Sequence, residues 1–128
     1  MDTEMMKLLE NDRFAAYVGI KLIKVDSGCA TAQMEITDKH LNGVNLVQGG
    51  AIFTLADFAF AAAANAKGFV TLGINANISY YKSPQGKLLT AEAKEISSSK
   101  KLCGYNVDVF DENNDLIARF NATGYIKR

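Results

Sequence analysis

A single carboxylate, Asp57, lies in a long apolar stretch of this chain. Between Leu41 and Ala66 no other residue is charged, and the composition of the stretch predicts a helix that is apolar almost all round. Such a helix is expected to be buried, and a carboxylate within it is costly unless it is hydrogen-bonded, paired or used in a reaction. We expect burial to raise the pKa of Asp57, as at many functional sites. The alternative is a structural carboxylate that caps a turn or pairs with a Lys or Arg.

The predicted helix begins with two glycines, Gly49 and Gly50. The N-terminus of a helix presents backbone N–H groups without partners and a partial positive charge. Glycine lets a ligand approach that backbone closely. The same apolar run is too short, too rich in Ala and too central in its placement of Asp57 to favour a membrane span.

Hydrophobic periodicity and turn residues divide the rest of the chain into short elements. Ser27-Gly28 predicts a hairpin turn, and Lys67-Gly68 predicts the end of the long helix. The predicted elements are a helix over 3–16, strands over 17–26 and 28–37, a loop over 40–48, a helix over 50–66, and strands over 70–82, 87–97, 101–111 and 116–127. In the strand over 70–82 the alternation runs through Leu72, Ile74, Ala76, Ile78 and Tyr80.

This order of elements predicts one α+β domain over residues 1–128, with an antiparallel sheet wrapped around one long central helix. A single sheet would leave one side of the helix and one sheet edge uncovered, and a free edge invites pairing. We therefore expect a homodimer at minimum, and a homotetramer if dimers pack together.

The composition excludes several classes of protein. Hydrophobic residues make up 48% of the 128 residues, which excludes a disordered chain. The net charge is zero, so the composition gives no sign of the excess positive charge typical of nucleic-acid binding. Two cysteines far apart and a single histidine do not form a metal site. The acidic N-terminus is not a signal peptide, so a cytoplasmic protein is expected, with no partner among nucleic acids or membranes.

Four motifs in their order and spacing carry a resemblance to a known family. They are His-Leu-Asn-Gly at 40–43, Val-Gln-Gly-Gly-Ala at 47–51, Thr-Leu-Ala-Asp at 54–57 and Asn-Ile-Ser-Tyr-Tyr-Lys-Ser-Pro at 77–84. From about residue 12 onwards the chain resembles the hotdog-fold acyl-CoA thioesterases of the phenylacetate-pathway (PaaI-like) kind. The resemblance implies hydrolysis of an acyl-CoA thioester, with no cofactor and with coenzyme A as part of the substrate.

The resemblance also implies roles for individual residues. Asp57 matches the family's nucleophile or general base, and these two roles stay open. Gly49 matches the glycine whose N–H binds the thioester carbonyl, and Asn42 matches a residue that orients the carboxylate or the water. Thioester hydrolysis does pass through an oxyanion that needs fixed N–H donors, and it needs a base or a nucleophile.

The spacing of Gly49 and Asp57 adds a constraint of its own. Eight residues of helix rise about 12 Å, so one chain cannot easily place both groups on one carbonyl. Two antiparallel copies of the helix can do so, with Asp57 of one subunit facing Gly49 of the other.

Two positions depart from the family pattern. Gln48 stands where the family usually has His; it keeps a donor and an acceptor but does not titrate near neutrality. Gly73 stands where many members have Ser or Thr on the strand after the helix, and Thr71 is two residues away. We expect Gly50, Thr54, Gly73 and Thr71 to bind the substrate. We expect Asp57, Gly49, Asn42 and Gln48 to take part in catalysis.

Other candidate residues have structural interpretations. His40 is expected to be a loop residue, the two cysteines Cys29 and Cys103 to be packing residues, and Phe53, Phe58 and Phe60 to be core or acyl-pocket wall. Solvated side chains are expected for Lys82, Lys87, Lys100 and Lys101, with contact to the phosphates of CoA as the alternative.

Two other functions compete with thioester hydrolysis. A non-catalytic acyl-CoA-binding or regulatory protein is favoured by Gln48 and Gly73. A hotdog dehydratase or hydratase ranks last, because that chemistry pairs a His with an acid and His40 lies outside the helix start. The sequence leaves open the acyl group, and also whether CoA or a carrier protein delivers it.

Overall fold

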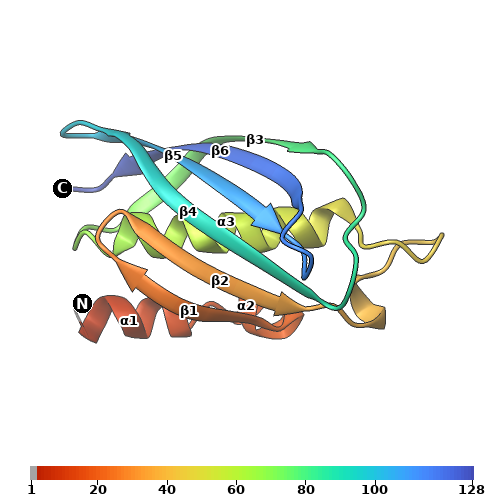
Figure 1. The fold of residues 1–128 in the computed structure, drawn as a ribbon. Coiled ribbons are helices and arrows are strands. Elements are labelled where there is room, and N and C mark those ends of the chain that lie inside the picture. Colours follow the sequence, from red (N-terminus) through yellow and green to blue (C-terminus); the bar gives the residue numbers. More distant parts are fainter. Residues whose placement is uncertain (1–2) are drawn as a thin grey trace.

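Residues 3–128 are described by a computed structural model. The chain contains three α-helices, one 3₁₀ turn and six strands in the described residues (Figure 1). Their bounds are α1 Thr3–Glu10, α2 Arg13–Val18, β1 Ile20–Asp26, β2 Cys29–Glu35, η1 Asp38–His40, α3 Gly49–Asn65, β3 Thr71–Tyr80, β4 Leu88–Ser98, β5 Leu102–Phe110 and β6 Leu116–Ile126.

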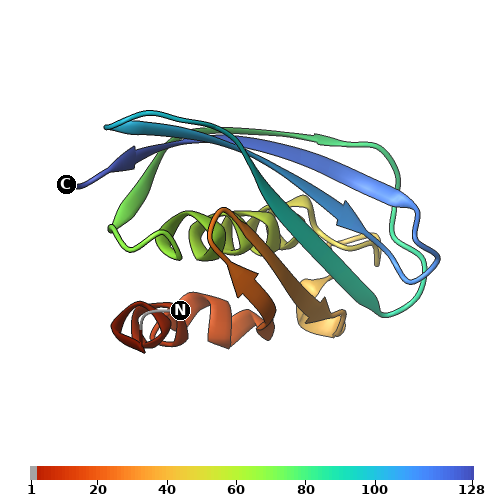
Figure 2. The ribbon, with the colours of Figure 1, turned by 60° about the vertical axis from the view of Figure 1, so that its left-hand side comes forward.

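The six strands form one antiparallel sheet in the order β1-β2-β4-β5-β6-β3. The sheet curves over α3, and α1 and α2 lie on the other side of that helix (Figure 2). This arrangement confirms the predicted hotdog fold. The strand order places β1 and β3 at the two edges, so β3 has a sheet partner on one side only.

The core lies between α3 and the concave face of the sheet. Small side chains on α3, mostly alanines, let the helix approach the strands closely, and β2 and β4 make the most extensive contact with it. Aromatic rings fill the wider space towards β5 and β6: Phe53 packs edge-on against Phe120, and Phe60 packs edge-on against Tyr105. Phe58 and Phe60 are buried in the core and Phe53 is partly buried against it, which agrees with the core interpretation of these three residues.

The N-terminal segment differs from its prediction, which was one helix over 3–16 and a strand from residue 17. Two helices form, because Asp12 caps the second one by accepting a hydrogen bond from the Ala15 N–H at 3.0 Å. The second helix ends at Gly19, whose φ of 87° is in the left-handed region that favours glycine. The strand therefore starts only at Ile20.

The side chains of β3 do not alternate between the two faces of the sheet in the way predicted for residues 70–82. A bulge between Gly73 and Asn75 shifts the register by one residue, so that Leu72 pairs with the exposed Tyr125 while Ala76 pairs with the buried Ala122. Leu72 thus faces away from the helix, whereas Ala76, Ile78 and Tyr80 face it. Leu72 and Ile74 are exposed apolar residues on a free edge strand.

Helix α3 has one uncovered side in the single chain, as expected for one sheet wrapped around one helix. Nine of its residues are buried, but Gly50, Thr54, Asp57 and Ala61 form a stripe that is partly or fully exposed. The stripe recurs every three or four residues, which is one face of a helix. No helix among residues 3–128 has the length and apolar character needed to cross a membrane.

Candidate active site

The start of α3 presents backbone N–H groups that no capping side chain occupies. Gln48 is the N-cap residue, is exposed, and makes no side-chain capping bond. Its backbone carbonyl accepts hydrogen bonds from the N–H groups of Ala51 and Ile52. None of the described hydrogen bonds uses the N–H of Gly49 or Gly50. These two donors therefore remain available to a ligand at the positive end of the helix.

Tyr80 contacts this helix start from the end of β3. Its hydroxyl group donates a hydrogen bond to the carbonyl oxygen of Gly49 at 2.9 Å. Burial raises the pKa of the phenol above its ordinary value, at which the hydroxyl is already protonated at neutral pH. Sequence reasoning placed Tyr80 in a strand but gave it no role, because only the return of β3 along α3 brings the two residues together.

Asp57 lies in the exposed stripe of α3, two turns beyond Gly49. Asp57 is exposed in the single chain, on the side of α3 that one sheet was expected to leave uncovered. The pKa of its carboxyl is nevertheless raised, first by partial desolvation among its neighbours and second by the negative charge of Asp12. A raised pKa makes the carboxylate a stronger base than a solvated aspartate.

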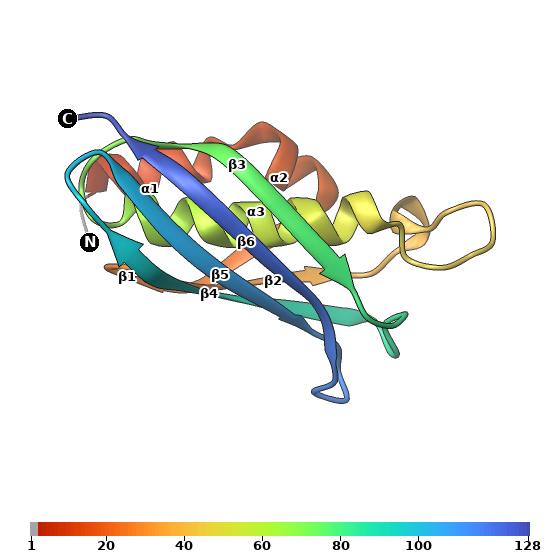
Figure 3. The ribbon, with the colours of Figure 1, turned by 90° about the horizontal axis from the view of Figure 1, so that it is seen from above.

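The loop before α3 contains Asn42 and projects beyond the body of the domain (Figure 3). The side-chain oxygen of Asn42 accepts hydrogen bonds from the N–H groups of Val44 at 2.9 Å and Leu46 at 3.1 Å. The side-chain oxygen therefore holds the loop itself. The positive φ of 62° in this loop belongs to Asn45 and not to Gly43.

Two predicted site residues bond to each other within the first turns of α3. The hydroxyl group of Thr54 donates to the carbonyl oxygen of Gly50 at 2.8 Å, one turn earlier. Both residues lie on the exposed stripe between Gly49 and Asp57. Both residues therefore belong to the side of α3 that the single chain leaves partly uncovered.

The structure places Thr71 and Gly73 at the other end of α3. Thr71 is buried, its N–H bonds to the side chain of Asn65, and its hydroxyl donates to the carbonyl oxygen of Phe69. Gly73 lies against Phe60: a Cβ there would be 3.3 Å from the ring. Thr71 therefore joins β3 to the C-terminal end of α3, and it does not approach the helix start.

The remaining candidates have structural surroundings. His40 is buried; its Nδ1 atom accepts from the Thr37 N–H, so Nε2 carries the proton and donates to the carbonyl oxygen of Val18 at 2.6 Å. Cys103 is buried, as a packing residue should be, but Cys29 is exposed, so its predicted packing role is wrong.

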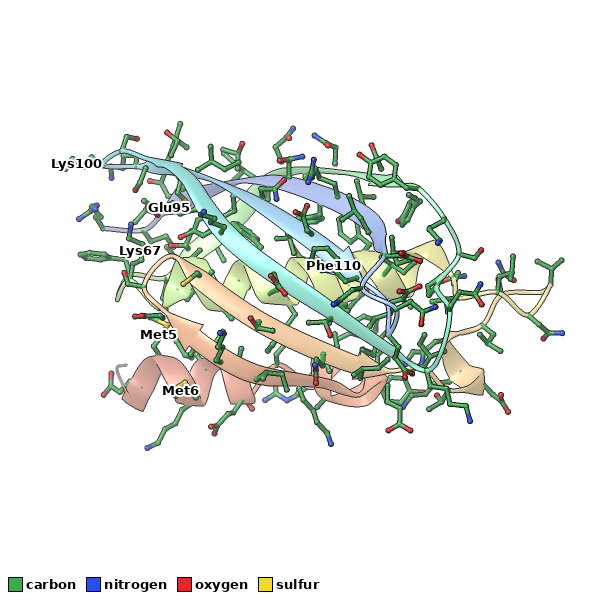
Figure 4. The ribbon with its side chains drawn as sticks, viewed as in Figure 1. Met5, Met6, Lys67, Glu95, Lys100 and Phe110 are labelled. Atoms are coloured by element: carbon green, nitrogen blue, oxygen red, sulfur yellow. The ribbon has the colours of Figure 1, made fainter. Side chains whose placement is uncertain are left out.

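Lysines at both ends of the domain form ion pairs with carboxylates. Lys82 pairs with Asp115 at 2.7 Å, near the end of β3. At the opposite end of the domain Lys67 pairs with Glu95 beside the β4–β5 turn that carries Lys100 (Figure 4). No group of three or more His, Cys, Asp or Glu residues in the described chain could hold a metal ion.

A cavity of about 500 Å³ lies between α1, α2 and β1. Its wall includes Phe58, the neighbour of Asp57, and Asp12, whose charge acts on Asp57. Most of the other side chains in the wall are apolar, among them Leu9, Ala15 and Leu22. The cavity offers a largely apolar volume on the side of Phe58, and Asp57 itself is not part of its wall.

Comparison with known proteins places the chain in a family. Residues 45–118, more than half of the chain, match the model of the thioesterase superfamily. The acyl-coenzyme A thioesterase PaaI of Escherichia coli is 31% identical over 119 residues, which are 92% of this chain and 85% of that protein. A relative from Archaeoglobus fulgidus is 36% identical over 119 residues, 92% of this chain and 77% of the relative. The solved structure of E. coli PaaI superimposes with a TM-score of 0.91 at 29% identity, covering 96% of this chain and 90% of the other.

Proposed function

Because the chain belongs to the thioesterase superfamily, as a PaaI-like hotdog-fold thioester hydrolase, we propose that it hydrolyses acyl-CoA to the free acid and coenzyme A. Two groups on α3 carry the proposal: the Gly49 N–H, which has no partner among the described hydrogen bonds, and the Asp57 carboxylate, whose pKa is raised. The N–H group can stabilise an oxyanion, and the carboxylate can act as base or nucleophile. The reaction needs water and no cofactor.

The oxyanion donor and the carboxylate come from different subunits in this proposal. Along the regular helix α3, Gly49 and Asp57 are about 12 Å apart, too far for one thioester carbonyl. An antiparallel copy of α3 laid along the exposed stripe would bring Asp57 of one protomer to Gly49 of its partner. The free edge of β3, with exposed Leu72 and Ile74, lies on the same side and supports pairing of the two sheets.

The residues around this pair have supporting roles in the proposed site. Gln48 and the loop with Asn42 lie at the helix start and can donate to the carbonyl or to the attacking water. Gly50 and Thr54 follow Gly49 on the same face of α3, so they would line the site next to the oxyanion donor. The apolar cavity beside Phe58 is proposed to take the acyl group, since an acyl chain or ring is stabilised by apolar surroundings.

A thiol-release assay over a panel of acyl-CoAs tests the activity. We expect Asp57→Asn to lower kcat by about 100-fold or more, since a positioned base contributes at least that much. Asp26→Asn, a change of the same type at the exposed end of β1, should keep wild-type kcat. Binding of acyl-CoA without release of thiol by the wild-type protein would contradict hydrolysis and favour a binding protein.

A subunit-mixing experiment tests the shared site. Gly49→Pro removes the N–H at the first helical position, where proline is tolerated, and Gln48 already has the backbone conformation that precedes proline (φ −68°, ψ 139°). Circular dichroism must show that this variant folds, because its Cβ would lie 3.0 Å from the ring of Tyr80. Each variant alone should be inactive.

Mixing Gly49→Pro with Asp57→Asn protein would then restore one intact site in each mixed dimer. In a random mixture of subunits this gives about a quarter of wild-type activity. No recovery after verified exchange of subunits would place both groups in a site of one chain and contradict the shared-site proposal.

A further inference from the structure

Tyr80 occupies the space beside the first residue of α3. A Cβ added to Gly49 would lie 3.0 Å from the Cζ atom of Tyr80 and 3.1 Å from its hydroxyl oxygen. Contacts that short are tighter than ordinary Cβ contacts, so a side chain at position 49 would require the ring of Tyr80 to move by a few tenths of an ångström. Packing against Tyr80 therefore favours glycine at this position, apart from any need of a ligand.

The register of β3 directs Tyr80 towards α3. Tyr80 pairs with Ala118 on β6, which is buried against the helix, and the side chains of paired residues share a face of the sheet. The ring is still 49% exposed, because the strand ends at this residue and the helix begins beside it. The hydroxyl group is thus at the mouth of the proposed site and its hydrogen bond is to the backbone.

The helix start needs an anchor that leaves its donors free. A conventional N-cap side chain accepts a hydrogen bond from the N–H group of the second or third helical residue, here Gly50 or Ala51. Such a side chain would lie in front of the helix start, beside the Gly49 N–H group that an oxyanion would use. Gln48 makes no such bond. Tyr80 bonds to the carbonyl of Gly49 instead, so it holds this residue from the opposite side and consumes no donor.

We propose that Tyr80 is a positioning residue, which holds Gly49 so that its N–H group points at the thioester carbonyl. The inference rests on the proposed function for its kinetic consequence, but the anchoring of the helix start is a property of the free protein. Tyr80 acts through Gly49 and takes no part in the bonds that form and break.

Tyr80→Phe is the direct test, because it removes the hydroxyl group and keeps the ring. Tyr81→Phe is the matched control: the neighbouring ring is 56% exposed and makes none of the described side-chain hydrogen bonds. We expect Tyr80→Phe to lower kcat by about ten-fold, less than the loss of a whole oxyanion donor, with KM changed by less than about two-fold. The control should keep both constants, and both variants should keep the wild-type melting temperature within a few degrees.

A second measurement does not depend on turnover. The ¹⁵N relaxation order parameters of the Gly49 and Gly50 amides should fall in Tyr80→Phe and stay at wild-type values in Tyr81→Phe. Unchanged order parameters in Tyr80→Phe, or a kcat equal to that of the control, would overturn the role of Tyr80. If the wild-type protein hydrolyses no acyl-CoA, the proposed function fails, and the order parameters still decide whether Tyr80 anchors Gly49.

Discussion

Asp57 on α3 lies within electrostatic reach of Asp12, the residue that caps α2. Desolvation is the larger cause of the raised pKa of Asp57, and the like charge of Asp12 raises it further. The N-terminal helices therefore influence the candidate base as well as covering one flank of α3. A substitution of Asp12 can therefore test how the ionisation of Asp57 controls the pH dependence of hydrolysis.

Asp12→Asn should extend hydrolysis to lower pH. Asp57 must be ionised to act, and removing a neighbouring negative charge makes ionisation easier, so the acidic limb of kcat/KM moves down in pH. Asparagine is as good an N-cap residue as aspartate, so α2 should stay intact. Rate profiles from acid to neutral pH check this, with Asp26→Asn as the control. An unmoved limb would show that the ionisation seen in the profile is not that of Asp57.

Asp111→Asn should destabilise the fold. The buried carboxylate of Asp111 accepts backbone N–H groups from Gln85, Asn113 and Asp115, and it joins the turn after β5 to the loop after β3. Burial opposes ionisation of Asp111, but these backbone donors and the charge of Lys82 outweigh it, so its pKa is lowered. We expect a fall in melting temperature of about 5 °C or more at pH 7.

The pH dependence of the Asp111 effect has a definite sign. A lowered pKa in the folded state gives stability that is present above the ordinary aspartate pKa of 3.8 and is lost as the pH falls through the folded value. The gap between wild type and variant should therefore close in acid. Asp115→Asn is the control, since it breaks only an exposed ion pair with Lys82 and should shift the melting temperature little.

Ile74→Lys should separate the subunits. Ile74 lies at the bulge of the free edge strand β3 and is 59% exposed, and a lysine on an edge strand opposes pairing with a second strand. Sedimentation velocity should show a folded monomer, with hydrolysis reduced to the level of Asp57→Asn. Ile96→Lys, at a 65% exposed position on β4, should keep the dimer. A fully active Ile74→Lys monomer would refute the shared site.

Gln48→His should change kcat by less than about three-fold. Gln48 is exposed and makes no capping bond, so a histidine fits without loss of helix stability, and fixed N–H donors supply the larger part of oxyanion stabilisation. The wild-type rate profile should show one acidic limb. A gain of about ten-fold or more would instead identify the site as one that lacks a proton carrier.

Much of the fold could be predicted because hydrophobic spacing is a local property. The long helix was predicted over 50–66 and is Gly49–Asn65, and each strand after it was predicted within two residues of its ends. The break between α1 and α2 was missed, because a single capping bond from Asp12 decides it. The bulge in β3 was also missed, because the apolar alternation of its sequence continues through the bulge and only pairing with β6 reveals the shift.

For the candidate site, too, the sequence determined the local features, and only the tertiary structure decided the contacts between distant residues. The sequence by itself determined that a lone carboxylate follows two glycines at a distance of two helical turns, because residue type and helical rise are both local. Only the tertiary structure decided that Asp57 lies on an uncovered stripe, that Asp12 approaches it, and that Thr71 is turned to the other end of the helix. Tyr80 and Gly49 are 31 residues apart, and their contact exists because β3 runs back along α3. Contacts between distant segments depend on how the sheet folds over the helix. The local sequence pattern does not determine that folding, so it cannot predict such contacts.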